Sequence, residues 1–237
     1  DEGATLTDSQ KLWRRAKRVM PGGVSLLSKR PDMHLPDNWP TYFTSAKGCR
    51  VTSLEGREYL DMGMMGVGTS ILGFGDPRVD EAVARVVKQG VVSTLNCPEE
   101  VLLAERLVEL HPWSGQARFA RSGGEACAMA VRIARAASGR DGVAICGYHG
   151  WHDWYLAANL SANSALDGHL LPGLSTRGVP RALVGTTVAF DYNDFDGLKE
   201  IVSSNDIGVI IMEVERSTPP ASGFLEAVRD LASRHGV

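Results

Sequence analysis

The feature that most constrains the fold is an alternation of short apolar runs with helical patterns in the second half of the chain. Four strand-like runs stand out, at residues 117–120, 143–146, 182–190 and 207–213. Between and after them, apolar residues recur at the spacing of amphipathic helices. Strands that alternate with helices imply a mainly parallel sheet with helices on both faces. We therefore predict an α/β fold for this part of the chain.

The first 70 residues show a different pattern of predicted secondary structure. Residues Ser9–Met20 form an amphipathic helical pattern that ends at "PGG", residues 21–23. Short β-like runs at 40–62 predict a small antiparallel meander. The glycine-rich stretch "MGMMGVGTSILGFG" predicts a loop near a ligand. We predict an N-terminal helix and β-meander segment over residues 1–70, followed by an α/β domain over 71–237.

Composition excludes several classes of function. A net charge of −3 with 22% charged residues predicts no nucleic-acid partner. No apolar run approaches the roughly 20 residues that a membrane span needs, and the N-terminus has no apolar stretch typical of a secretory signal. The cysteines show no C-x-x-C spacing, which favours reduced thiols in a cytoplasmic protein: Cys49, Cys97, Cys127 and Cys146.

The stretch "RSGGEACAMAVRIARAASGR", residues 121–140, predicts a capped helix. Ser122 and Glu125 have capping-box spacing, and Gly139 is placed to end the helix. Gly123 and Gly124 either make a tight turn or offer free N–H groups to an anion, most often phosphate. The helix carries one apolar stripe at helical spacing: Ala126, Met129, Ala130, Ile133, Ala134 and Ala137.

Three segments follow predicted strands and converge on the crevice where open α/β sheets bind ligands. They are "RSGGEA", "GYHGWHDWY" and "EVERSTPP". An aromatic such as Tyr148 can stack on a flat heterocycle, whereas Trp151 and Trp154 read as buried residues of a surface turn. Two histidines with one nearby carboxylate do not make a metal site. Glu213 either is solvated or points into the crevice. The convergence favours the anion site over the simple turn.

The chain resembles the N-terminal part of a class III, pyridoxal-phosphate-dependent aminotransferase, and in particular the glutamate-1-semialdehyde 2,1-aminomutases. The matching stretches run in the family's order. They are "PGGV" (21–24), "GREYLDM" (56–62), "ILGFGDPRVDEAV" (71–83), residues 121–153 and residues 208–237. The resemblance implies a fold type I architecture, with the C-terminal part absent from this chain. It also implies a cytoplasmic homodimer that uses a small-molecule amino donor and a carbonyl acceptor.

The resemblance also implies roles for single residues. The backbone at Ser122, Gly123 and Gly124 would hold the cofactor phosphate. Tyr148 would stack on the pyridine ring, His149 would sit beside it, and Glu213 would stand near it. "PGGV" and the loop at 64–70 would line the substrate entrance, which makes Ser25 and Val67 candidate substrate residues.

Two groups that the family's reaction needs are missing between residues 1 and 237. They are an aspartate that pairs with the pyridine nitrogen and the lysine that forms the Schiff base, both expected downstream of Val237. We therefore expect residues 1–237 alone to be inactive. Two hypotheses remain: part of a longer aminotransferase or aminomutase, or a non-catalytic module that binds a phosphate ligand or dimerises.

Overall fold

The computed structural model describes residues 6–36, 38–64, 66, 68–169 and 172–237. Contacts within the chain divide it into two compact units, Asp1–Cys97 and Pro98–Val237. The division predicted between residues 70 and 71 stays a prediction.

In the first unit, the N-terminal helix ends where two glycines and an aromatic ring meet. Helix α1 (Asp8–Val19) is capped by Thr7 and buries Trp13. The short 3-10 turn η1 (Pro21–Gly23) follows. Gly23 has φ +76°, and a Cβ atom there would lie 2.5 Å from the Trp13 ring. Only glycine satisfies both the backbone conformation and the contact, which explains the predicted stop at "PGG".

The predicted meander of the first unit is confirmed. Strands β1 (Phe43–Lys47), β2 (Arg50–Ser53) and β3 (Glu58–Leu60) pair antiparallel in that order. Helix α2 (Pro77–Gln89) follows the glycine-rich loop and begins at an Asp76 cap.

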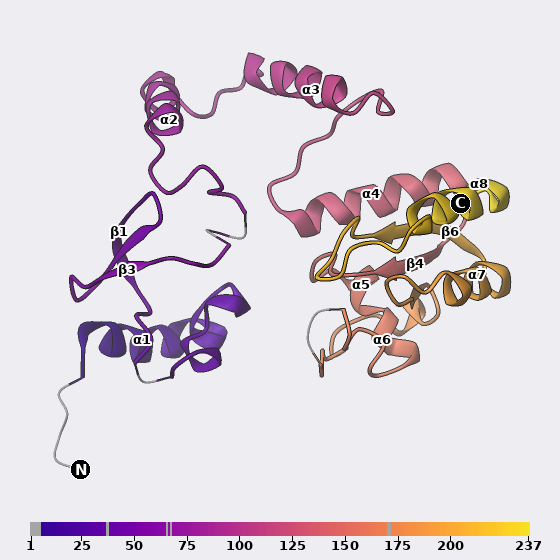
Figure 1. Ribbon diagram of the computed structural model, residues 1–237, viewed down its shortest axis with the longest axis horizontal. Helices are drawn as coiled ribbons and strands as arrows, with labels where there is room; N and C mark the ends of the chain where they lie inside the picture. Colours follow the sequence, from indigo (N-terminus) through magenta and orange to yellow (C-terminus); the bar gives the residue numbers. More distant parts are fainter. Residues whose placement is uncertain (1–5, 37, 65, 67, 170–171) are drawn as a thin grey trace, which may run out of the picture. The chain divides into compact units, whose positions relative to one another are not determined.

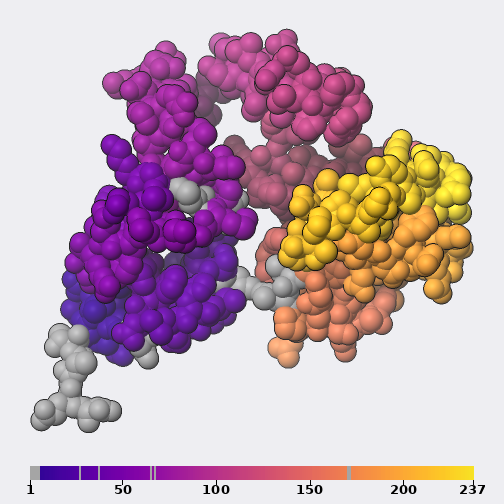
Figure 2. Space-filling view, in the orientation of Figure 1, coloured from indigo at the N-terminus to yellow at the C-terminus, as the bar shows by residue number. Residues whose placement is uncertain are grey.

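The second unit is a three-layered α/β arrangement (Figure 1). Strand β4 (Gly142–Cys146) lies between β5 (Thr187–Ala189) and β6 (Ile207–Met212), and both pairings are parallel. Five helices pack on this sheet. On one face lie α4 (Gly123–Ser138), α5 (Asp153–Leu156) and α6 (Ala158–Ser161); on the other lie α7 (Phe195–Ser204) and α8 (Phe224–His235). In the space-filling view, the orange and yellow segments that contain α7 and α8 form one close-packed surface (Figure 2). The predicted parallel α/β fold is confirmed.

The residues of β4 point alternately into two apolar clusters. Val143 and Ile145 pack with α4, α5 and α6, whereas Ala144 and Cys146 pack with α7 and α8. All four side chains are fully buried. A strand that is covered on both faces has a continuous apolar sequence, and this pattern is what predicted β4.

Two expectations were wrong. Residues Ala117–Ala120 form no strand in the described structure, and both edges of the central strand β4 are already taken by β5 and β6. On α4, the face toward the sheet carries Val131 with Cys127 and Ala134, whereas most of the predicted stripe is exposed. Apolar residues, mostly alanines, lie on more than one face of α4, so periodicity could not select its buried face. Helix α3 (Pro98–Leu110) precedes α4 in the chain.

Because β4 is buried on both faces, truncating one of its side chains should destabilise the fold. Replacing Ile145 by alanine should lower the free energy of unfolding by about 2–5 kcal/mol, because the cavity left in a packed core adds to the lost transfer energy. Ile133→Ala on α4 is the matched control, since that side chain is 61% exposed and its truncation should change little. Urea unfolding of both variants measures the difference. Equal losses would show that the sheet is not packed as described.

Candidate functional site

The candidate site lies where β4 and β6 end. The two strands run in parallel, with Cys146 opposite Met212, so Gly147 and Glu213 leave the sheet side by side. A Cβ atom on Gly147, which has φ +98°, would lie 2.7 Å from the Glu213 side chain. The absence of a side chain at Gly147 therefore leaves room for the carboxylate at this edge of the sheet.

The N-terminus of α4 borders the same loop. Ser122 caps the helix through its hydroxyl, which accepts a hydrogen bond from the Glu125 N–H at 3.3 Å. The Glu125 carboxylate accepts from the Arg121 N–H at 3.0 Å, one residue before the cap. The predicted capping box is thus half formed, because the glutamate reaches past the capping residue.

The glycine pair has two different environments. A Cβ atom on Gly123 would meet nothing within 4 Å, whereas one on Gly124 would lie 3.2 Å from the His152 ring. Gly150 has φ +100°, and a Cβ atom there would lie 2.6 Å from the Gly124 Cα atom. Gly124 is therefore explained by close backbone packing, while Gly123 faces open space.

The open side of this helix end suits an anion. Within the described part of the chain, no acceptor within hydrogen-bond distance faces the N–H groups of Gly123 and Gly124. The first N–H groups of a helix lack partners inside the helix and lie at the positive end of its dipole. Both the unpaired donors and the free space at Gly123 fit a phosphate group.

Tyr148 and His149 follow β4, and their environments differ. Tyr148 is half-buried, and burial raises the pKa of its hydroxyl. Its ring lies edge-on to Trp151 and to Tyr155, with centroids 6.3 and 5.8 Å away. His149 is buried, and its Nε2 donates to the Cys146 carbonyl at 2.9 Å.

The tryptophan prediction was half right. Trp154 is buried, but Trp151 is 53% exposed. Helix α5 begins after His152, so Trp154 lies on it and packs into the core cluster, whereas Trp151 stays in the preceding loop.

The Glu213 carboxylate is not fully solvated, because it contacts the loop that follows β4. Its Oε1 accepts from the Tyr148 N–H at 3.0 Å, and its Oε2 lies 3.5 Å from the Arg216 Nε. The two side chains are only 34% and 22% exposed. This carboxylate therefore holds the start of the aromatic loop and has a cation beside it.

Sequence reasoning missed His169 and Arg216. His169 is buried, its Nδ1 accepts from the Gly147 N–H at 3.0 Å, and its carbonyl accepts from Arg216 Nη2 at 3.3 Å. Burial, and then the Arg216 charge, lower the His169 pKa. For Arg216, the one sequence feature that could have pointed to the site is its position three residues after Glu213. Nothing in the polar stretch 147–181 marked His169.

The roles predicted for the two substrate residues stay predictions. Ser25 is exposed and belongs to the first unit, while Val67 falls outside the described residues. Among the residues that the structure describes, no group of three or more His, Cys, Asp and Glu side chains is arranged to hold a metal ion. No helix in that part of the chain has the length and apolarity that crossing a bilayer requires.

Comparison with known proteins adds an independent observation. The sequence model of the aminotransferase class-III family matches residues 34–237. The chain is 37% identical over 237 residues to glutamate-1-semialdehyde 2,1-aminomutase from Desulfovibrio desulfuricans, covering 97% of this chain and 54% of the relative. It is 32% identical to 3-aminobutyryl-CoA aminotransferase from Cloacimonas acidaminovorans, covering 99% of this chain and 54% of the relative.

The fold is also similar to solved structures. One, described as a transaminase with PLP bound, superposes with a TM-score of 0.83 at 30% identity, over 99% of this chain and 55% of that one. The chain thus spans about half the length of the curated relatives it matches.

The two buried histidines predict a loss of stability in mild acid. Burial lowers the pKa of both His149 and His169 in the folded chain, while the unfolded chain binds protons near the ordinary value of about 6.5. Below that pH the unfolded state therefore holds more protons, so the free energy of unfolding falls as the pH drops from about 6.5 to 5.5. Above pH 6.5, these two rings do not make the free energy of unfolding depend on pH.

Urea unfolding at stepped pH measures this effect. The slope should be shallower over the same window in His149→Gln and in His169→Asn, each of which removes one titrating ring. A parent curve that stays flat between these pH values contradicts the assignment of neutral rings.

Proposed function

Because the chain belongs to the class III aminotransferase family, we propose that it supplies the phosphate site and the ring-stacking face of a PLP-dependent aminotransferase or aminomutase. The observation that carries the proposal is the placement of unpaired N–H groups at Gly123 and Gly124 against the loop that bears Tyr148. An anion site beside an aromatic face matches a phosphorylated planar cofactor. The family's cofactor is pyridoxal phosphate.

Different residues of this chain would contact different parts of the cofactor. Ser122, Gly123 and Gly124 would bind its phosphate through backbone N–H groups. Tyr148 would cover one face of the ring, with His149 beside it and Glu213 holding the loop. The bound cofactor would supply an electron-withdrawing ring that stabilises negative charge on a substrate carbon. Ser25 and Val67 are proposed to lie at the substrate entrance.

The proposed reaction moves an amino group between a small-molecule amino donor and a carbonyl acceptor, or within one substrate. Similarity to an aminomutase at 37% identity and to an aminotransferase at 32% supports both forms. The lysine that carries the Schiff base is proposed to lie downstream of Val237. The alternative is a non-catalytic phosphate-binding or dimerisation module.

We further propose a cytoplasmic homodimer. Cys49, Cys97, Cys127 and Cys146 are all free thiols, as expected for a reducing compartment. Exposed apolar side chains on α2 and α3 are surfaces that a second copy would cover. Sedimentation analysis of the purified protein tests the dimer, and a monomer at all concentrations would exclude it.

The decisive functional experiment compares two proteins. One is expressed from the complete reading frame in which this sequence lies, and the other is residues 1–237 alone. Each is incubated with pyridoxal phosphate, reduced with borohydride and examined by mass spectrometry, and each is assayed with amino donors and carbonyl acceptors. An adduct and turnover only in the first protein support the proposal. Cofactor binding without turnover in the first protein favours the non-catalytic module.

Gly123→Val tests the phosphate site. The added side chain would occupy the open space before α4 and block the N–H groups there. The dissociation constant for pyridoxal phosphate should rise at least about tenfold, because one hydrogen bond to a charged group is worth about 1.5–3 kcal/mol. Gly115→Val is the matched control, because a Cβ atom there also meets nothing within 4 Å. Fluorescence titration measures both. Unchanged affinity in Gly123→Val would place the phosphate elsewhere.

Tyr148→Ala tests the stacking face. Stacking of an aromatic pair is worth about 1 kcal/mol, so cofactor affinity should fall several-fold. Tyr148→Phe keeps the ring and should retain most of the affinity. If alanine and phenylalanine bind pyridoxal phosphate equally well, the ring does not stack on the cofactor.

A further inference from the structure

The backbone that leaves β4 is held by side chains from outside the strand. In the peptide unit between Cys146 and Gly147, the N–H donates to His169 Nδ1 at 3.0 Å. Its carbonyl accepts from His149 Nε2 at 2.9 Å and from the Glu213 N–H at 3.2 Å. Both polar groups of this buried peptide unit are therefore satisfied.

The next peptide unit is held in the same way. The Gly147 carbonyl accepts from the Tyr155 hydroxyl at 3.0 Å, and the Tyr148 N–H donates to Glu213 Oε1 at 3.0 Å. Two consecutive peptide units just before the Tyr148 side chain thus have no unpaired group. Such complete pairing fixes the direction in which that ring leaves the sheet.

We propose that His169 and Arg216 are positioning residues that fix the backbone of Gly147 and Tyr148, so that the Tyr148 ring meets the cofactor in one orientation. The inference rests on the proposed function, which places that ring against pyridoxal phosphate. Neither residue touches the cofactor in this scheme, and both act through the backbone of the loop.

His169 can play this part only as a neutral ring. An N–H group donates to its Nδ1, so Nδ1 carries no proton and the remaining hydrogen is on Nε2. The ring is 6% exposed and comes from a segment 22 residues beyond Gly147. Protonation would place a second donor against the Gly147 N–H and break the contact.

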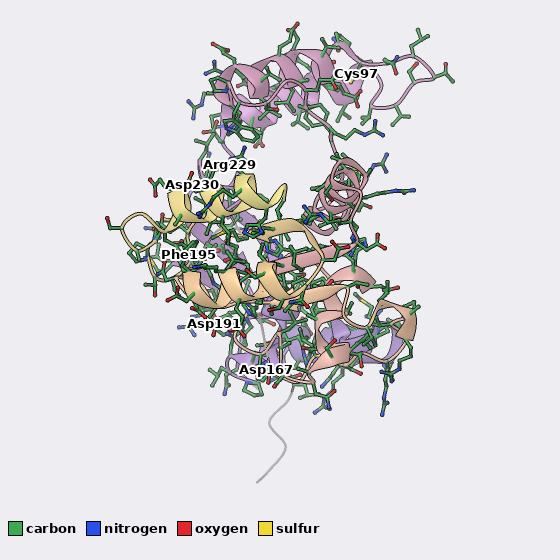
Figure 3. The ribbon with its side chains drawn as sticks, turned by 90° about the vertical axis from the view of Figure 1, so that its right-hand side faces the viewer. Cys97, Asp167, Asp191, Phe195, Arg229 and Asp230 are labelled. Carbon is green, nitrogen blue, oxygen red and sulfur yellow. The ribbon has the colours of Figure 1, made fainter. Side chains whose placement is uncertain are left out.

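The charges that face His169 come from several elements. Arg216 disfavours its protonation, whereas Asp191 and Glu213 favour it, and His149 disfavours it. A cavity of about 350 Å³ beside the ring is also lined by Asp191 and Asp194, which flank the entry to α7. Figure 3 labels Asp191 in this segment.

Arg216 joins the two halves of the network. Its Nη2 donates to the His169 carbonyl at 3.3 Å, and its Nε faces Glu213 Oε2 at 3.5 Å. One planar guanidinium therefore connects the residue that holds Gly147 with the residue that holds Tyr148. A lysine offers a point charge on a flexible stem and cannot reproduce this fork.

Amide hydrogen exchange in the cofactor-free protein tests the inference directly. In His169→Leu, which lacks the acceptor, the Gly147 amide should exchange about 2- to 10-fold faster, the range that the net free energy of one hydrogen bond implies. His169→Asn should restore protection, because its amide oxygen can stand in for Nδ1. The Gly139 amide, which donates to the Arg135 carbonyl at the end of α4, is the internal reference. His235→Asn, on an exposed ring, is the control variant.

Arg216→Gln gives a second, independent variant should His169→Leu fail to fold. Exchange should rise at both Gly147 and Tyr148, and Arg216→Lys should not restore it. Arg229→Gln on the exposed surface of α8 is the matched control, and Figure 3 labels that residue. Equal exchange at Gly147 and Tyr148 in all variants overturns the inference.

The protection of the Gly147 amide should also fall in acid, once the pH drops below the pKa of His169, which burial and Arg216 hold below the ordinary value of about 6.5. In His169→Asn this fall should vanish, because the asparagine does not titrate. A fall that persists unchanged in His169→Asn overturns the neutral-ring part of the inference.

Cofactor measurements separate this inference from the proposed function. In the protein without substitutions (the parent), bound pyridoxal phosphate should show circular dichroism in the absorption band of the cofactor. The band and the affinity should fall in His169→Leu and recover in His169→Asn. If the parent binds no cofactor, the proposed function fails, and exchange alone decides whether the residues position the loop. If the parent binds it and His169→Leu loosens the loop while affinity and dichroism stay unchanged, the positioning inference is overturned.

Discussion

The arrangement of the site depends on how β4 ends. This strand is paired on both edges and covered on both faces, so its carboxyl end lies inside the molecule. A buried backbone that leaves a sheet loses its ladder partners, and an unpaired buried N–H or C=O is costly. Gly147 lets the chain turn at φ +98°, and side chains replace the missing strand partners. The same groups that satisfy this requirement also fix Tyr148.

Much of this fold could be predicted because its signals are local. Strands β4 and β6 are apolar runs in the sequence, and α4 is capped by Ser122 at its start and by Gly139, whose φ is +68°, at its end. A continuous apolar run arises when both faces of a strand are buried, so it carries the layer arrangement with it. Position after such a strand was also enough to single out Tyr148 and Glu213.

The rest depended on partners that are distant in sequence. Residues Ala117–Ala120 have a strand-like composition, but a strand exists only when a neighbour pairs with it, and the sequence pattern does not specify the neighbour. His169 and Arg216 reach the loop from 22 and 69 positions beyond Gly147, and no periodicity marks them. Likewise, α4 has apolar residues on more than one face, so its buried face is chosen by the sheet and not by the helix.

The two glycines at the start of α4 have different surroundings. A tight turn and an anion site were the alternatives when only the sequence was considered, and both glycines lie within α4. In the structure, Gly124 meets the backbone of Gly150, while the space beside Gly123 is open. The first contact presses the aromatic loop against the start of α4, and the second leaves the helix N–H groups accessible. Close packing at Gly124 is thus what would bring an anion held at Gly123 within reach of the loop that carries Tyr148.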